Sequence, residues 1–223
     1  MKRVLLLLLV FASSTAVFGQ TYDTEVDVGV RLKYNITSYS KFKQSDLPDG
    51  YDLKTFGYAV GGFLQMRVNH FYFQPELTYS YIQTTIAAPL ENDPNYDHGE
   101  IELRFNSFQL PLLVGYRTSF DNVALRFGAG PVFTYLFDTN GVLDYTPGAQ
   151  VDVPEDLLTD FNDFTLSARF GVGLDVGAFL FDVMYEKGFS RLNEEFTIFG
   201  GEDLGKESSW VFGVGFKLIR HHQ

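Results

Sequence analysis

The feature that most constrains this chain is a two-residue period in hydrophobicity that recurs in eight segments. Large apolar residues occupy one parity of each segment, and Gly, Ser, Thr or charged residues occupy the other. Successive side chains of a strand point to opposite faces, so each segment predicts a β-strand with one apolar face. The segments lie near residues 25–36, 55–69, 71–81, 101–116, 122–135, 163–177, 179–189 and 210–218.

The connections between these segments alternate in length. Very short turns are expected at Asn69-His70, Ser119 to Asn122, and Gly177-Ala178, and the other four connections are long. The long ones cover residues 37–54, 87–100, 138–162 and 192–206. This alternation is typical of outer-membrane barrels, with short periplasmic turns and long external loops. The sequence therefore predicts an all-β fold, an eight-stranded antiparallel transmembrane up-and-down β-barrel.

The volume of the apolar side chains indicates which face points outward. The chain has 23 Phe and 13 Tyr, and most of them share the apolar parity. An eight-stranded barrel has an interior just wide enough for its own side chains, so this set does not fit inside, as a soluble lipocalin-like barrel would require. We expect the apolar parity to face lipid. Aromatic girdles are expected from Tyr34, Phe56, Tyr58, Phe71, Tyr81, Tyr116, Tyr135, Phe179, Phe189 and Trp210.

The N-terminal residues predict export. Residues 1–19 combine a basic start, a short apolar run and small residues at the end, as a cleavable signal peptide does. The run is too short for a membrane-spanning helix, which is the alternative. Residues 20–223 then form one barrel domain, integral to the bacterial outer membrane. The chain has no Cys, so neither a disulfide framework nor a lipoprotein anchor is expected.

Charged residues also occupy the inward parity, with both signs in comparable number. A self-paired structural network filling the lumen is the first interpretation, because an unpaired charge there is costly. A narrow ion or proton path is the alternative, although a selective pore favours a ring of one sign. The residues of this lumen charge network are Asp27, Arg31, Lys33, Arg67, Glu76, Arg117, Arg126, Arg169, Asp175, Asp182, Glu186 and Lys217.

Other chemistry is sparse in the sequence. His98, beside Asp97, is the one external histidine that could serve a hydrolase, and an ordinary solvated loop residue is the simpler interpretation. The acidic third connection could bind calcium weakly, but its spacing does not match an EF-hand. Its acids are Asp138, Asp144, Asp152, Glu155, Asp156, Asp160 and Asp163. We expect no catalytic residues, no cofactor and no metal site, and the net charge of −11 disfavours nucleic acid as a partner.

Two features disagree with a regular barrel. Pro75, Pro111 and Pro131 lie inside predicted strands, where each removes a ladder hydrogen bond, so local bulges are expected. The apolar parity also switches within the fourth segment, from Leu103 and Phe105 to Phe108 and beyond. A bulge near residues 106–107 would keep both sets on the lipid face.

Two central segments resemble the PorT-like outer-membrane β-barrel family. They read NSFQLPLLVGYR at residues 106–117 and RFGAGPVFTY at residues 126–135, where the family has an aromatic-x-x-Pro-Leu-Leu strand and then an Ala-Gly-Pro strand. Gln109 stands where the family leads us to expect an acidic residue. The resemblance implies a small eight-stranded barrel of the Bacteroidota outer membrane. The member that gives the family its name belongs to the type IX secretion machinery.

Three hypotheses for function follow. The first is a non-enzymatic barrel with a structural, accessory or partner-docking role, linked to protein secretion through the resemblance, that contacts an envelope partner through its external loops or periplasmic rim. The second is a small porin-like pore or transporter with a charged lumen. The third is an outer-membrane hydrolase that uses His98.

Overall fold

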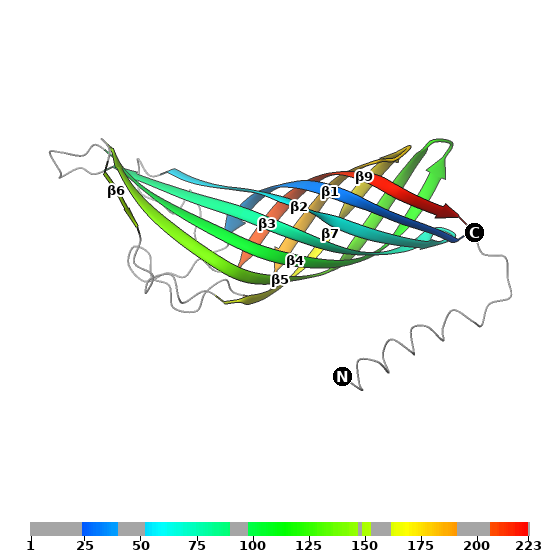
Figure 1. Ribbon diagram of the computed structural model, residues 1–223, viewed down its shortest axis with the longest axis horizontal. Helices are drawn as coiled ribbons and strands as arrows, with labels where there is room; N and C mark the ends of the chain where they lie inside the picture. Colours follow the sequence, from blue (N-terminus) through cyan, green and yellow to red (C-terminus); the bar gives the residue numbers. More distant parts are fainter. Residues whose placement is uncertain are drawn as a thin grey trace, which may run out of the picture.

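The computed structural model describes residues 24–39, 52–89, 98–146, 149–152, 162–190 and 206–222. Eight of its strands form a closed antiparallel barrel, as predicted, because β1 pairs with both β2 and β9 and β4 pairs with β5 (Figure 1). A ninth strand of four residues, β6, pairs with β5. The strands are β1 (Thr24–Tyr39), β2 (Asp52–Val68), β3 (Phe71–Pro89), β4 (His98–Phe120), β5 (Val123–Thr146), β6 (Ala149–Asp152), β7 (Phe164–Val176), β8 (Phe179–Gly188) and β9 (Glu207–His222).

The described residues contain no helix long and apolar enough to cross a membrane. The predicted signal peptide lies outside the described residues and stays a prediction.

Three two-residue turns join strands at one end of the barrel. They lie at Asn69-His70, Asp121-Asn122 and Gly177-Ala178, as the short connections predict. The first residue of each turn has a positive φ, of 54°, 50° and 58° respectively. Asn, Asp and Gly are the residues that tolerate this conformation best. The first residues of β1 and the end of β9 lie at this same end (Figure 1), which is the periplasmic side in barrels of this type.

The outward face of the barrel is apolar. Phe71, Leu32 and Trp210 leave 69%, 63% and 51% of their surface exposed, although they are large hydrophobic residues. Aromatic neighbours pack against each other on this face, for example Tyr185 with Trp210 at 5.2 Å between ring centroids. Such an exposed apolar belt has no stable place in water and fits the hydrocarbon of a bilayer.

The belt ends toward the outer rim, where the outward residues become polar. Ser38, Lys187 and Ser208 lie side by side on β1, β8 and β9, because Ser208 pairs with both of the others. Outward residues one step nearer the turns are apolar, as Ile36, Tyr185 and Trp210 illustrate. The outer boundary of the hydrocarbon therefore lies between Trp210 and Ser208.

The fourth predicted segment keeps one alternation throughout β4, so the expectation that Leu103 and Phe105 share the lipid face with Phe108 is wrong. Leu103 and Phe105 are buried inside the barrel, with 1% and 4% of their surface exposed, whereas Phe108 faces outward. A bulge does lie at the predicted place, but the extra residue is Phe137 in β5, since Asn106 pairs with Asp138 and Ser107 with Leu136. The bulge therefore shifts the partner strand and leaves the faces of β4 unchanged.

The three prolines interrupt the sheet without bulges, contrary to expectation. Pairing between β2 and β3 stops at Phe63–Glu76 and resumes in the same register at Met66–Phe73, on either side of Pro75. Pro111 and Pro131 produce the same kind of gap, in the β3–β4 and β4–β5 ladders. A missing N–H group removes a ladder hydrogen bond, but the neighbouring pairs hold the strands in register.

The barrel wall has unequal height. The β5–β7 ladder ends at Tyr135–Phe164, yet β5 continues to Thr146, and β3 and β4 extend to pair Pro89 with His98. These extensions sweep beyond the rest of the barrel at the end away from the turns (Figure 1). We call this part, residues 82–89, 98–106 and 138–146, the tall flank. Sequence patterns placed much of it in loops.

Candidate functional site in the lumen and at the outer mouth

Each residue of the predicted lumen charge network points into the barrel and forms an ion pair with another charged residue. The pairs group into three levels that follow one another from the periplasmic end outward. Two inward acids that sequence reasoning missed, Glu25 and Glu207, stand on the same parity as Asp27 and Lys217 in their strands. That parity could have identified them. They were missed because each lies at the very start of a strand.

At the periplasmic level, Glu25 accepts the ends of two arginines. Arg67 lies 2.6 Å away and Arg117 lies 3.2 Å away, both on its Oε2. Lys217 links β9 to Asp27 at 2.6 Å and to Asp175 at 3.2 Å. These contacts connect strands β1, β2, β4, β7 and β9 across the lumen.

At the middle level, Arg126 bridges two carboxylates. Its side chain lies 2.5 Å from Asp175 and 2.8 Å from Asp182, and it is 1% exposed. Arg31 approaches Asp182 at 2.9 Å from the other side and also pairs with Glu76. Glu76 in turn pairs with Lys33.

At the outer level, Arg169 and Glu186 form a pair at 2.5 Å. Ser167 donates a hydrogen bond of 2.5 Å to the second oxygen of Glu186, and Arg169 donates one of 3.1 Å to Gln109. Gln109, the residue that departs from the PorT-like pattern, therefore lies inside the lumen as a partner of this arginine.

The inward face of the described strands is nearly balanced in charge. A buried ion is costly unless it is paired, so the balance accounts for the presence of so many ions in a narrow barrel. Eight residues are basic and seven are acidic: Arg31, Lys33, Arg67, Arg117, Arg126, Arg169, Lys217 and Arg220, and Glu25, Asp27, Glu76, Asp175, Asp182, Glu186 and Glu207. Arg220 is the half-exposed one, at the periplasmic rim, 3.7 Å from Asp27.

The side chains leave little space along the lumen. A void of about 10 Å³, lined by Arg31, Lys33, Asp182 and Arg169 among others, lies at the middle level. A cavity of about 40 Å³ lies at the outer mouth. A single water needs ~10–15 Å³ measured in this way, so these spaces hold roughly one water and three waters. The Arg169–Glu186 pair stands between them, since Arg169 lines the void and Glu186 lines the cavity.

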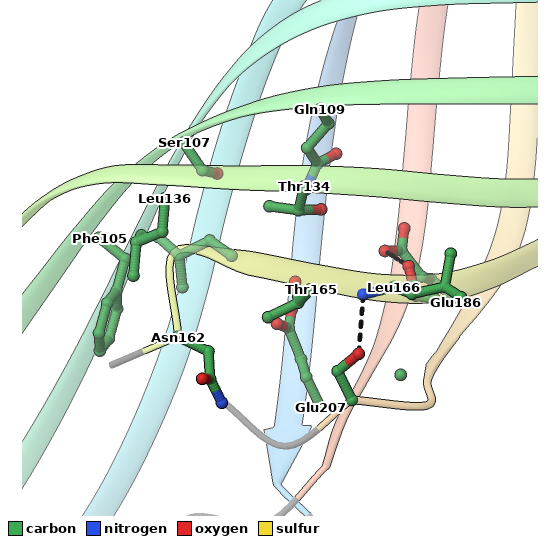
Figure 2. Close-up of a pocket in the computed structure, with 14 residues that line it drawn as sticks. Phe105, Ser107, Gln109, Thr134, Leu136, Asn162, Thr165, Leu166, Glu186 and Glu207 are labelled. Atoms are coloured by element: carbon green, nitrogen blue, oxygen red, sulfur yellow. Dashed lines mark hydrogen bonds between the residues drawn. The ribbon is translucent and has the colours of Figure 1, made fainter. Parts of the chain in front are cut away.

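The mouth cavity has walls of different character (Figure 2). Ile82, Phe105 and Leu136, from the tall-flank side, supply apolar surface. Hydroxyl and amide groups of β4, β5 and β7 supply polar surface, and two carboxylates, Glu186 of β8 and Glu207 of β9, complete the lining. Described residues of this lining are Ile82, Phe105, Ser107, Gln109, Thr134, Leu136, Asn162, Thr165, Leu166, Ser167, Glu186, Gly188, Ser190 and Glu207.

Glu207 lies beyond the hydrocarbon boundary, one residue outward of Ser208. Burial at the mouth raises the pKa of Glu207 to about 7, and the negative charge of Glu186 acts in the same direction. Ser209 donates a hydrogen bond of 3.0 Å to Glu207 Oε1, which offsets part of that effect. The mouth thus carries a carboxyl group that titrates near neutral pH.

The other candidate residues are only partly described. His98 begins β4 and pairs with Pro89 and Thr146. Its side chain is outside the part of the chain that the structure describes. Among the acids of the third connection, Asp138 accepts a hydrogen bond of 2.9 Å from Asn106 and Asp163 is exposed. The side chains of Asp144, Asp152, Glu155, Asp156 and Asp160 are outside the description, so the calcium hypothesis stays untested. Within the described ranges no three metal-ligating acidic, His or Cys side chains gather.

Comparisons with known proteins point to one family. Residues 13–194 match the family described as "Outer membrane protein beta-barrel domain". No curated protein matches the sequence significantly.

Similar solved structures include three barrels from other bacteria. Ail, the attachment invasion locus protein of Yersinia pestis, has 16% identity and a TM-score of 0.40, with 89% of this chain and 99% of that chain covered. The outer membrane protein OprG from Pseudomonas aeruginosa has 13% identity and a TM-score of 0.41, with 88% of this chain and 96% of that chain covered. Neisserial surface protein A has 14% identity and a TM-score of 0.39, with 86% of this chain and 97% of that chain covered.

Proposed function

The chain belongs to the outer-membrane β-barrel domain family and is an integral outer-membrane protein, and from this premise we propose that it is a non-enzymatic barrel that docks an envelope partner. In this proposal the barrel is a rigid anchor. The tall flank and the connections beyond it face the partner, which is a protein of the cell envelope. The PorT-like resemblance of residues 106–117 and 126–135 supports a link to protein secretion.

The observation that carries the proposal is the filled lumen. All twelve charges of the predicted network are paired with one another or with Glu25, and two spaces of about 10 and 40 Å³ lie among the inward side chains. A water-filled channel needs a continuous path, and a selective one favours an excess of one charge. A barrel whose interior is occupied in this way offers its rims and extensions, rather than its axis, for interaction.

The tall flank supports docking in particular. It places strands β3, β4 and β5 beyond the hydrocarbon boundary as a continuous ladder, with Ile86 still paired to Ile101 and Glu100 to Asp144. A sheet that continues past the membrane costs ordering entropy that a simple connection avoids. A stable surface for a partner is a physical reason for an extension that carries this entropy cost.

Site-specific photo-crosslinking in living cells tests the proposal. A photoreactive residue at Thr139 on the tall flank should give one main protein adduct, identified by mass spectrometry. The matched position is Lys187, an exposed residue at the outer end of β8, where we expect little or no protein adduct. Lipid adducts alone from both positions would overturn the docking proposal.

Planar-bilayer recordings test the pore alternative. We expect the purified barrel to show no discrete conductance, because the Arg169–Glu186 pair separates the two spaces along the axis. Stepwise openings of the wild-type protein would replace docking by transport as the leading function. For the hydrolase alternative, loss of a lipid- or peptide-hydrolysing activity in His98→Ala would overturn the non-enzymatic part of the proposal.

A further inference from the structure

Glu207 differs from the other inward carboxylates in its charge balance. Glu25, Asp27, Glu76, Asp175, Asp182 and Glu186 each have a basic partner within 4.0 Å. Glu207 forms no ion pair with a described residue within 4.0 Å, and its carboxylate accepts hydrogen bonds from the hydroxyls of Ser209 and Thr37, with Arg169 acting on it from farther away. Glu186, which also lines the mouth cavity, already accepts bonds from Arg169 and Ser167 on its two oxygens. Among the described residues the cavity therefore holds one carboxylate, that of Glu207, without a cation in direct contact.

The polar wall of the cavity offers further acceptors for a cation. The side-chain hydroxyls of Ser107, Thr134 and Thr165 line it. Each hydroxyl oxygen has two lone pairs. Figure 2 shows Thr134 of β5, Thr165 of β7 and Glu207 of β9 around the cavity, and β8 lies between β7 and β9 in the sheet. Carboxylate and hydroxyl oxygens together match the three N–H donors of an ammonium group.

The apolar wall requires hydrocarbon on the same ligand. Ile82 and Phe105 are 8% and 4% exposed, and they face the cavity from β3 and β4. A bare or hydrated metal ion gains nothing from this surface, and calcium takes 6–8 oxygen ligands. A cavity of about 40 Å³ holds an ammonium group with the methylenes next to it, since roughly three waters fill the same space.

We propose that the mouth cavity binds a primary alkylammonium group, with the nitrogen held by Glu207 and the hydroxyls and the alkyl carbons against Ile82, Phe105 and Leu136. The raised pKa of Glu207, about 7, agrees with this assignment, because an ammonium would supply the missing positive charge. Two sources share this chemistry: a small free amine from the medium, and the end of a Lys side chain from another protein. The proposal is independent of the docking function above.

Titration of the folded, micelle-embedded protein at pH 8 tests the site. Butylammonium and butanol are added to isotope-labelled protein, and the backbone amide shifts of Thr165 and Glu207 are followed by NMR. We expect saturable shifts with butylammonium and much weaker ones with butanol. Equal responses to the two compounds, or no saturable response to butylammonium, would overturn the proposal.

Two matched variants locate the charge that matters. Glu207→Gln should weaken butylammonium binding by about tenfold or more, the loss that accompanies removal of one charge-assisted hydrogen bond. The control is Glu102→Gln, which removes an acid of β4 that pairs with Arg104 on the outward side, and it should change affinity by less than about twofold. Equal affinity in wild type and Glu207→Gln would show that the site is not built on Glu207.

A second arm distinguishes the two sources. A capped Gly-Lys-Gly peptide and the same peptide with norleucine in place of Lys are titrated under identical conditions. Binding of the Lys peptide at least as tight as that of butylammonium assigns the cavity to a protein side chain. Binding of butylammonium alone assigns it to a free amine. Failure of both would overturn the alkylammonium site and leave the crosslinking test of docking unaffected.

Discussion

Tyr72 lies with its ring over Gly115 and its hydroxyl over Gly128, so that a Cβ atom on Gly128 would stand 2.4 Å from the Tyr72 hydroxyl oxygen. Gly115 lies between them in the sheet, since it pairs with Tyr72 on one side and with Gly128 on the other. The two glycines thus form a smooth patch that accepts one aromatic ring inside a narrow barrel. Their inward position is a packing requirement of this particular tyrosine.

Gly115→Ala should destabilise the barrel by about 1–3 kcal/mol, because the new methyl group overpacks the interior. Its Cβ would stand 2.5 Å from the Tyr72 ring and 2.1 Å from the Phe127 carbonyl oxygen. Gly213→Ala is the control, since the nearest atoms there lie at 3.5 Å. The free energy of unfolding of each variant is measured by urea unfolding in lipid vesicles. The transition is followed by the fluorescence of Trp210, the single tryptophan. Equal destabilisation in the two variants would contradict the packing argument.

Tyr72→Phe should leave the free energy of unfolding unchanged within about 0.5 kcal/mol or raise it. The Tyr72 hydroxyl is buried and has no hydrogen-bond partner among the described residues, and removing an unsatisfied buried polar group relieves its desolvation cost. The same urea titration measures the change. A loss of more than about 1 kcal/mol, the net value of one hydrogen bond, would show that the hydroxyl has a partner.

Arg126→Met should lower the free energy of unfolding by about 3–5 kcal/mol, the cost of removing one partner of a buried ion pair. The variant leaves Asp175 and Asp182 with one cation fewer at the middle level of the lumen. Arg104→Met is the matched control, because its pair with Glu102 lies on the outward side with 42% of the arginine side chain exposed. We expect less than about 1 kcal/mol there. Similar values for both would indicate that water reaches the middle level.

Stability should fall as the pH rises from about 4.5 to about 7. In that window Glu207 is protonated in the folded barrel, where its pKa is about 7, and ionised in the unfolded chain, where its pKa is near 4.5. The folded state therefore binds more protons, and raising the pH favours unfolding. Comparing urea midpoints of wild type and Glu207→Gln across this window isolates the contribution. An identical pH dependence of the two proteins would show that Glu207 keeps its ordinary pKa.

Arg169→Ala combined with Glu186→Ala should produce a small ionic leak in planar bilayers. The pair fills the space between the mouth cavity and the middle void, and truncating both side chains joins the two spaces without leaving an unpaired charge. Arg104→Ala with Glu102→Ala removes an ion pair outside the lumen and should leave the barrel closed. A double variant that conducts no ions would indicate that the middle level of the lumen is enough to seal the barrel.

Alternation predicted the strands and their faces because the side-chain period of two is a local property. Predictions that needed the partner strand were less successful. Leu103 and Phe105 are as apolar as the lipid-facing residues, and only the structure shows that the alternation of β4 continues without a shift and places both inside the barrel. The prolines were expected to bulge, yet intact pairs on both sides hold the register across each gap.

The members of the charge network could be read from parity, but their pairing could not. Arg31 meets Glu76, 45 positions away, and Arg117 meets Glu25, 92 positions away, because barrel closure brings their strands together. The mouth cavity was not predicted at all. It is formed by residues from β3, β4, β5, β7, β8 and β9, whose ends meet at one height, and no short sequence pattern records that meeting.

Unequal wall height gives the outer surface of this molecule a direction. A barrel of uniform height meets incoming molecules alike from all sides, whereas this one carries a raised sheet over β3, β4 and β5 and ends its ladders lower over β7, β8 and β9. The mouth cavity lies at the foot of that step, with its apolar wall on the raised side. A partner that contacts both the raised sheet and the cavity can do so in one orientation about the membrane normal. Fixed orientation about that axis is what an assembly within the plane of a membrane requires from each of its members.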